Sequence, residues 1–249
     1  MSVNAYLSCA TCALWLLIFV LYAIRIASRG AVHSERVAKI GGTALVARPI
    51  MDATYWAIEP VVRGLAALGI TPNGLTWSAL VLGVAAGVAL GVGWFGLGCL
   101  LATLSTIGDI LDGQVARLTK TGSNRGELLD AAVDRYTEFA FLAGLALWLR
   151  DSAWQLALVL AALLASFMVS YASAKAEALQ VSPPRGLMRR HERALYLILG
   201  VGMVPVLEPV LIARHWPPAT PVLVAVALVA VIGNLAAVQR FVRIGRALG

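Results

Sequence analysis

Apolar residues fall into seven long runs along the chain, separated by short polar or proline-containing stretches. The runs lie near residues 5–24, 75–98, 99–117, 127–149, 153–174, 193–212 and 219–239. A helix needs about 20 apolar residues to cross the roughly 30 Å hydrocarbon layer of a membrane, and each run is close to that length. The pattern therefore predicts an all-α, polytopic membrane bundle.

Composition and charge support this class and give it an orientation. The 249 residues are 60% hydrophobic and only 13% charged, which is too apolar for an ordinary soluble domain. Of the 20 Lys and Arg, only Arg150 and Arg214 fall in the loops on one side of the predicted bundle, so by the positive-inside rule that side is outside. The N-terminus is then outside. The net charge of +7 reflects membrane orientation, and we expect no nucleic-acid partner.

The N-terminal part of the chain is predicted to be an anchor followed by an interfacial segment. No Lys or Arg precedes the first apolar run, unlike the start of a cleaved signal peptide, so residues 1–27 are expected to stay as a membrane anchor. Residues 28–72 interleave basic and apolar side chains. We expect them to form amphipathic structure on the cytoplasmic membrane surface, interrupted at Pro49 and Pro60.

Two local signals mark the second predicted span. Thr71-Pro72-Asn73 predicts a helix start, with a proline in the first turn and Asn73 as a cap. Further along, Gly83, Gly87 and Gly91 recur every four residues and so share one helix face. Small residues at this spacing let two membrane helices approach closely, and the spacing favours helix packing over ligand contact.

Four carboxylates interrupt the apolar pattern at one membrane edge. Asp109 and Asp112 are three residues apart, and Asp130 and Asp134 are four apart, so on helices each pair shares a face. Ionised side chains in or near a bilayer are costly, and they persist where they bind ions, pair with one another or line a wet cavity. No Cys or His lies nearby. Oxygen ligands alone suit Mg²⁺, Mn²⁺ or Ca²⁺.

The same region carries a longer pattern, Asp-x2-Asp-Gly-x2-Ala-Arg, then eight residues, then Gly-x3-Asp-x3-Asp. Its fixed positions are filled by Asp109, Asp112, Gly113, Ala116, Arg117, Gly126, Asp130 and Asp134. The chain thereby resembles the CDP-alcohol phosphotransferase family over roughly residues 70–243. The resemblance implies a six-helix core at residues 73–243, a cytoplasmic tail at residues 244–249, and an added N-terminal anchor helix. It also implies a homodimer in the inner (cytoplasmic) membrane.

The family reaction is attack of an alcohol on the phosphorus next to the lipid of a CDP-linked lipid, with release of CMP. Carried over, the resemblance implies a cytoplasm-facing site in which Asp134 deprotonates the acceptor hydroxyl. Its implied metal ligands are Asp109, Asp112, Asp130 and Asp134. Its implied CDP-binding residues are Asp112, Gly113, Ala116, Arg117 and Gly126. Two divalent cations, Mg²⁺ or Mn²⁺, would neutralise the pyrophosphate of a donor such as CDP-diacylglycerol.

The acceptor alcohol is predicted from two later segments. Residues 170–178 and 189–193 resemble parts of bacterial phosphatidylinositol-phosphate synthases, in which basic residues hold the phosphate of inositol phosphate. Lys175 and Arg193 fall on the matching positions, although those synthases commonly have arginine at the first. Inositol phosphate is therefore the expected acceptor, with glycerol phosphate, serine or inositol as alternatives. Both residues also fit plain positive-inside anchors, and Arg185, Arg189 and Arg190 are expected to be surface charges.

Two other interpretations of the acidic cluster stay open at this stage. The first is a buried ion-pair network joining helices, with Arg117, Arg125 and Arg135 as partners. The second is an ion-coupled transporter, since transport pathways also concentrate acids, although no inverted repeat is visible and the acids lie away from the membrane midplane. Glu138, one turn beyond Asp134, is expected to be either a partner that orients the metal ligands or a protonated core residue.

Overall fold

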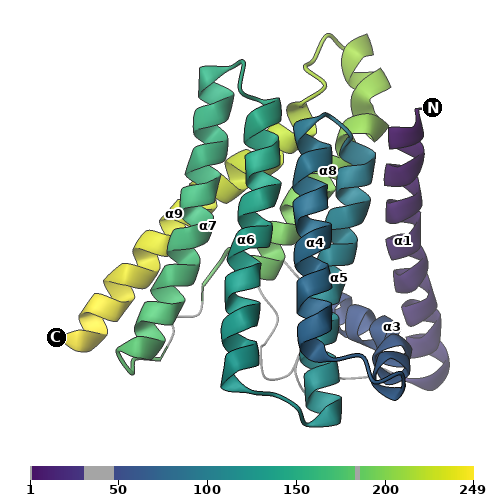
Figure 1. The fold of residues 1–249 in the computed structure, drawn as a ribbon. Coiled ribbons are helices and arrows are strands. Elements are labelled where there is room, and N and C mark those ends of the chain that lie inside the picture. The colour runs from purple at the N-terminus through teal and green to yellow at the C-terminus, as the bar shows by residue number, and fades with distance from the viewer. Residues whose placement is uncertain (1, 31–47, 183–185) are drawn as a thin grey trace.

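The computed structural model describes residues 2–30, 48–182 and 186–249, and all regular structure in them is helical. Long helices stand side by side, and the helix of residues 48–67 lies across one end of the bundle (Figure 1). The helices are α1 (Val3–Arg29), α3 (Arg48–Ala67), α4 (Pro72–Gly91), α5 (Phe95–Thr119), α6 (Asn124–Trp148), α7 (Ala153–Ala178), α8 (Arg190–Ala213) and α9 (Thr220–Leu248). The predicted all-α membrane bundle is confirmed.

Six of these helices are long and apolar enough to cross a membrane, namely α1, α4, α5, α7, α8 and α9. Helix α6 falls short because its first half carries charged residues. It is nevertheless 25 residues long and lies between α4 and α7 in the bundle (Figure 1). We therefore treat α6 as the remaining member of the six-helix core, α4–α9, with α1 packed against α5 and α8.

The helices differ from the sequence-based expectation in several places. The predicted break at residues 98 and 99 is wrong, because the chain turns at Val92–Trp94, where Gly93 has a φ of +82°. The apolar run continues through this turn, so hydropathy alone does not reveal it. Pro60 does not interrupt the interfacial segment, since α3 runs through it. The expected tail at 244–249 is helical as far as Leu248. Pro49 lies in the first turn of α3, and residues 31–47 before that helix are outside the described residues.

Helices α4 and α6 approach closely at glycines. A Cβ added to Gly87 would collide with the carbonyl of Ala140, and one added to Gly144 would collide with the carbonyl of Gly87. A Cβ on Gly83 would lie 2.7 Å from a methyl group of Thr137. The predicted packing role of the glycine stripe is thus confirmed. The contact holds α6, which carries Asp130 and Asp134, against α4.

The largest apolar core lies in the half of the bundle away from that cluster. It joins α4 through α9 and includes Leu90, Leu142, Leu145, Val201 and Val226, each fully buried. A smaller core lies at the opposite end, where Ile58 and Val62 of α3 pack on Leu111 and Val115 of α5. Helix α3 thereby covers the end of α5 that bears Asp109 and Asp112.

Candidate active site

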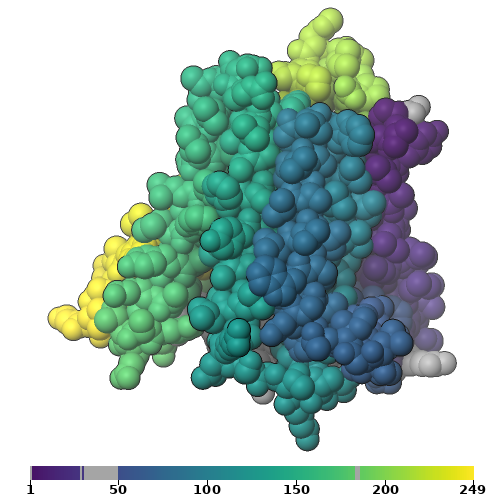
Figure 2. Space-filling model, in the orientation of Figure 1, coloured from purple at the N-terminus to yellow at the C-terminus, as the bar shows by residue number. Residues whose placement is uncertain are grey.

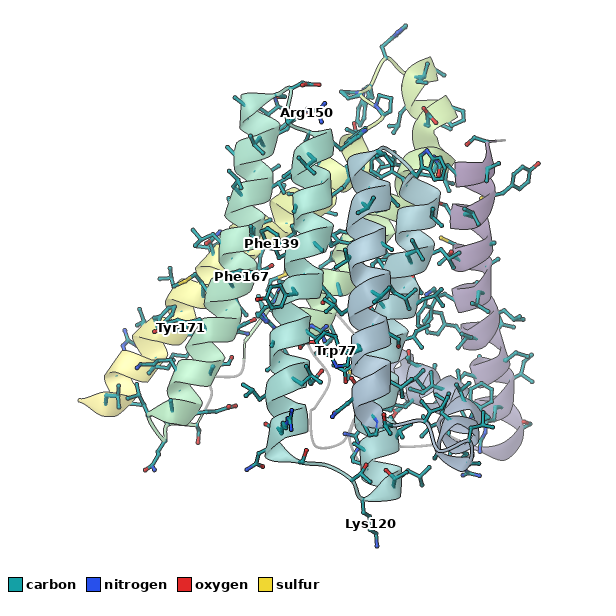
Figure 3. The ribbon with its side chains drawn as sticks, viewed as in Figure 1. Trp77, Lys120, Phe139, Arg150, Phe167 and Tyr171 are labelled. Carbon is teal, nitrogen blue, oxygen red and sulfur yellow. The ribbon has the colours of Figure 1, made fainter. Side chains whose placement is uncertain are left out.

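The acidic residues lie at the end of the bundle marked by the α5–α6 turn. Lys120 in this turn and Arg150 in the α6–α7 turn lie at opposite ends of the molecule (Figure 3). The α5–α6 turn projects beyond the other segments at its own end (Figure 2). A cavity of about 1110 Å³ opens at this end, between the α3–α4 connection, α5, the start of α6 and the first residue of α8. Such a cavity is large enough for a polar head group of nucleotide size.

Three of the predicted metal ligands meet on one wall of this cavity. Asp109 from α5 and Asp130 and Asp134 from α6 offer carboxylate oxygens that lie within 4.8 Å of one another. Each side chain is partly buried. Within the described residues, Asp130 Oδ1 is buried and has no hydrogen-bond partner. Three carboxylates at this separation, one with an unused buried oxygen, fit a hard divalent cation.

Asp112 is the fourth predicted ligand, and it lies slightly apart from these three. Its side chain is buried, lines the same cavity, and accepts a 2.6 Å hydrogen bond from the Thr76 hydroxyl. Thr76 is the fifth residue of α4. The N-cap of α4 is Thr71, whose hydroxyl accepts a bond from the Gly74 N–H, so Asn73 is not the cap. The start of α4 thus fixes the orientation of a carboxylate on α5.

All predicted CDP-binding residues line the cavity. They are Asp112, Gly113, Ala116, Arg117 and Gly126. A Cβ on Gly113 would lie 3.4 Å from the Arg117 guanidinium, and a Cβ on Gly126 would lie 3.3 Å from the Ser123 hydroxyl. Both glycines therefore keep polar groups close to the helix backbone at the cavity wall. Ser123 accepts from the Gly126 N–H, which starts α6 at the cavity.

Arg190 is the main difference from the sequence-based expectation. It was predicted to be a surface charge, but its guanidinium reaches into the acidic cluster. Nη1 lies 2.6 Å from Asp109 Oδ2, and Nη2 lies 2.6 Å from Asp134 Oδ1. The prediction was wrong because the sequence does not reveal that α8 begins beside α5 and α6. Arg189 precedes α8 as its N-terminal cap residue, and Arg185 lies outside the described residues.

A second ion-pair cluster lies one turn deeper. Arg193 is wholly buried and binds Glu138 through two bonds, Nε to Oε1 at 2.8 Å and Nη2 to Oε2 at 3.1 Å. It also donates to the Met188 carbonyl, while Arg135 binds Glu138 and the Ser170 hydroxyl. Two arginines around one carboxylate stabilise its ionised form, which argues against a protonated Glu138. The cluster ties α6, α7 and α8 together.

Comparison with known proteins identifies the family. The family model for CDP-alcohol phosphatidyltransferases matches residues 69–242, which is more than half of the chain. The chain belongs to the CDP-alcohol phosphatidyltransferase family. It is therefore an enzyme, as the motif predicted, and the transporter interpretation is set aside. The matched region begins just before α4 and ends within α9, so α1 and α3 precede it.

Individual relatives narrow the comparison within this family. The phosphatidylinositol phosphate synthase of Mycobacterium marinum is 34% identical over 172 residues, covering 66% of this chain and 70% of the relative. The crystal structure of the Mycobacterium tuberculosis phosphatidylinositol phosphate synthase with CDP-DAG bound has a TM-score of 0.64 and 29% identity. It covers 74% of this chain and 92% of the other. Another structure of that enzyme, in complex with manganese and citrate, also has a TM-score of 0.64 and 29% sequence identity. The comparison covers 74% of this chain and 87% of the other.

The two predicted acceptor residues do not line the large cavity that holds the other predicted site residues. Lys175 is exposed in the last turn of α7, and neither it nor Arg193 is among the described residues that line the large cavity. Their roles stay predictions. The ion-pair interpretation of the acids was partly right, since Arg135 lies 3.7 Å from Asp134 and also pairs with Glu138. It did not name Arg190, which contacts both Asp109 and Asp134.

Sequence reasoning also missed Thr76, which no motif position specifies. One signal was available for the arginines. Arg190 and Arg193 are three apart on α8, and Asp134 and Glu138 are four apart on α6, so each pair shares a helix face. Matching spacings of opposite charge on two membrane helices indicate facing surfaces, because unpaired charges there are costly.

Proposed function

We propose that this enzyme transfers a phosphatidyl group from CDP-diacylglycerol to a hydroxyl of inositol phosphate and releases CMP. The observation that carries the proposal is the group of Asp109, Asp130 and Asp134 on the wall of a cavity that also gathers every predicted CDP-binding residue. The relatives support the choice of acceptor, since those compared above are phosphatidylinositol phosphate synthases. Glycerol phosphate, serine and inositol are the alternative acceptors.

In this proposal Asp109, Asp112, Asp130 and Asp134 would hold two divalent cations, Mg²⁺ or Mn²⁺. When bound, the cations supply positive charge to the pyrophosphate and so stabilise the departing phosphate. The manganese complex of the similar synthase supports a divalent metal. Asp112 is oriented by Thr76. The other three carboxylates come from α5 and α6, which both pack closely on Gly83 of α4, where an added Cβ would lie 3.1 Å from Ser105 Oγ of α5 and 2.7 Å from a methyl group of Thr137 of α6. These contacts support preorganised ligand oxygens.

Bond changes follow from this arrangement. Asp134 accepts the proton of the acceptor hydroxyl, whose oxygen forms a new bond to the phosphorus beside the lipid. The bond from that phosphorus to the bridging oxygen of the pyrophosphate breaks, and CMP leaves with the bridging oxygen. Arg117, at the cavity wall, is placed to bind a phosphate oxygen of the nucleotide. The glycines at 113 and 126 leave room for the donor near the helix backbone.

The orientation is part of the same proposal. We place the cavity at the cytoplasmic face of the inner membrane, because the basic residues gather at the end that carries Lys120 and are few at the end that carries Arg150. CMP and a phosphorylated alcohol are charged and water-soluble, and a cavity open to the cytoplasm gives both a path. The predicted homodimer belongs to this proposal as well.

An acceptor panel tests the reaction. Purified enzyme would receive CDP-diacylglycerol with inositol phosphate, glycerol phosphate, serine or inositol, and CMP release would be measured in Mn²⁺, Mg²⁺ and chelator. We expect metal-dependent release that is fastest with inositol phosphate. Release that is fastest with an acceptor lacking phosphate would move the enzyme to another branch of the family. Full turnover in excess chelator would contradict the metal site.

The acceptor residues have their own test. If Lys175 binds the acceptor phosphate, Lys175→Ala should raise the acceptor KM by roughly ten- to a hundredfold, as expected for one charge-assisted bond. The donor KM should stay close to its original value. Lys175→Arg should keep phosphate binding, since a guanidinium can form two parallel bonds. Equal effects on donor and acceptor would leave Lys175 as a membrane-surface anchor.

A further inference from the structure

Helices α6 and α8 are joined by two arginine–carboxylate contacts, one above the other. Arg190 binds Asp134 and Arg193 binds Glu138. The two contacts differ in their surroundings. Arg193 and Glu138 are almost fully buried, whereas about a third of the Arg190 side chain is exposed to the large cavity. The deeper contact therefore fixes the start of α8, and the outer contact borders the space where substrate and metal would bind.

Arg190 uses two of the oxygens that a divalent cation would need. Its two terminal nitrogens lie 2.6 Å from Asp109 Oδ2 and from Asp134 Oδ1. Those two aspartates belong to the group whose oxygens lie within 4.8 Å of one another. A guanidinium and a metal ion cannot both contact the same carboxylate oxygens without strong repulsion between the two cations. Binding of a cation there requires Arg190 to move.

A small cavity gives the Arg190 side chain a place to go. A space of about 60 Å³ lies between α4, α5, α6 and α8, and Arg190 lines both this space and the large cavity. Its wall carries the hydroxyls of Ser105, Thr106 and Thr137 and the carboxylate of Glu138. A displaced guanidinium would find acceptors there, so the movement would not leave a buried charge unpaired.

We propose that Arg190 is a built-in counter-cation of Asp109, Asp130 and Asp134, and that divalent cations displace the Arg190 side chain toward the small cavity between α4, α5, α6 and α8. The inference rests on the proposed metal site and goes beyond it, because it assigns a competing role to a residue outside the family motif. Arg190 holds the carboxylates together when the cation concentration is low, and it sets how tightly the cation binds. It is a positioning residue that acts through Asp109 and Asp134.

Mn²⁺ binding measured by electron paramagnetic resonance tests this without any turnover. The signal of free aqueous Mn²⁺ would be titrated with purified protein and with Arg190→Gln. Removing the competing charge-assisted bonds should tighten Mn²⁺ binding by roughly ten- to a hundredfold. Arg190→Lys, which keeps the charge but loses the fork, should fall between the two. Binding to Arg190→Gln that is equal to or weaker than that of the original protein would overturn the inference.

Two controls separate competition from other causes. Arg189→Gln removes the same charge one residue earlier and leaves Arg190 in place, so it should change Mn²⁺ binding little. An equal tightening in Arg189→Gln would show a general charge effect and overturn the inference. Asp130→Asn reports binding outside the aspartate group. If the original protein bound no more Mn²⁺ than Asp130→Asn, the metal site itself would be contradicted. If Mn²⁺ bound to the aspartates with the same affinity in the Arg190 variants, only the proposed competition between Arg190 and the cation would be contradicted.

Thermal unfolding in chelator gives a second measurement. Without the guanidinium, Asp109, Asp130 and Asp134 repel one another, so Arg190→Gln should unfold at a lower temperature than the original protein in chelator. Added Mn²⁺ should remove most of this difference, because the cation replaces the lost charge and stabilises the folded state by binding it. A difference that Mn²⁺ leaves unchanged would indicate a purely structural role for Arg190 and contradict the proposal.

Discussion

The two halves of α6 contrast sharply although they belong to one helix. The first half carries Asp130 and Asp134, contacts Arg190 and lines the large cavity. Glu138 and its arginine partners lie just past the midpoint. The second half carries Leu142 and Leu145, both fully buried in the largest apolar core. Packing of the second half stabilises the position of the whole helix. The first half can therefore carry charged residues, although their ion pairs alone would contribute little net stability.

This contrast separates what supports the fold from what supports the reaction. In the packed half, a substitution should change the free energy of unfolding and leave each folded molecule active. In the charged half, an isosteric change of a carboxylate should remove activity and leave the fold intact. Glu138 and Arg193 lie at the border, and there we expect electrostatics to control stability.

The largest effect is expected at Asp134. Asp134→Asn keeps the size of the side chain but removes the proposed base and a metal-binding charge, so CMP release should fall by at least roughly 10²- to 10⁴-fold. Thermal unfolding should show a folded protein. The matched control is Asp151→Asn, whose side chain is exposed at the other end of the bundle. Retained turnover in Asp134→Asn would contradict the proposed roles of Asp134 as base and metal ligand.

The next effect concerns the border between the halves. Arg193→Ala leaves Glu138 with one arginine in a buried setting, which should lower the free energy of unfolding by about 3–5 kcal/mol. Chemical unfolding in detergent measures this loss. Arg150→Ala serves as control, because its partner Asp151 is exposed. Adding Glu138→Gln to Arg193→Ala should recover part of the stability; no recovery would show that the loss does not come from the unpaired charge.

A smaller loss is expected in the packed half. Gly144→Ala would push a Cβ into the carbonyl of Gly87, so we expect a loss of about 1–3 kcal/mol in the free energy of unfolding. Turnover per folded molecule should stay near its original value. Gly64→Ala is the control, since its added Cβ meets no atom within 4 Å and alanine favours the helix. Similar losses in both variants would argue against a specific α4–α6 contact.

The glycine packing face and the meeting of Asp109, Asp130 and Asp134 could be predicted from the sequence for the same physical reason. Apolar length determines that a helix crosses the membrane, and the glycine stripe shows where two helices meet, so both are visible along a single chain. The aspartate motif is local as well. Its two parts lie in α5 and α6, which are consecutive and joined by a short turn, so their carboxylates meet without help from distant segments.

What could not be predicted depends on contacts between segments far apart in the chain. Arg190 is 81 residues from Asp109, and Thr76 is 36 residues from Asp112. The spacing of the charges indicates that α8 faces α6, but it does not reveal these two contacts with α5, which depend on the packing of α4 and α8 beside that helix. The turn at Gly93 was missed for a different reason, since a tight turn of apolar residues between two membrane helices leaves no break in hydropathy.

The smallest effect is expected at the far end, where α1 joins the core. The side chain of Asn4 accepts a 3.3 Å bond from the Gly96 N–H in the first turn of α5, and its amide donates to the Gly93 carbonyl at 3.4 Å. Asn4 thus caps α5 from another helix, since Trp94, the cap residue, makes no side-chain cap bond. Asn4→Ala should cost about 1 kcal/mol of unfolding free energy, as cap losses do, without changing turnover.

Asn4→Asp sharpens this prediction. A carboxylate keeps the acceptor for the Gly96 N–H and lies near the positive end of the α5 dipole, but it cannot donate to Gly93. Its stability, measured by thermal unfolding, should lie between Asn4→Ala and the original protein. Because α1 precedes the region that matches the family, a loss of turnover in either folded variant would show that the added helix shapes the distant site. Unchanged turnover is the result expected if the two ends of the bundle act separately.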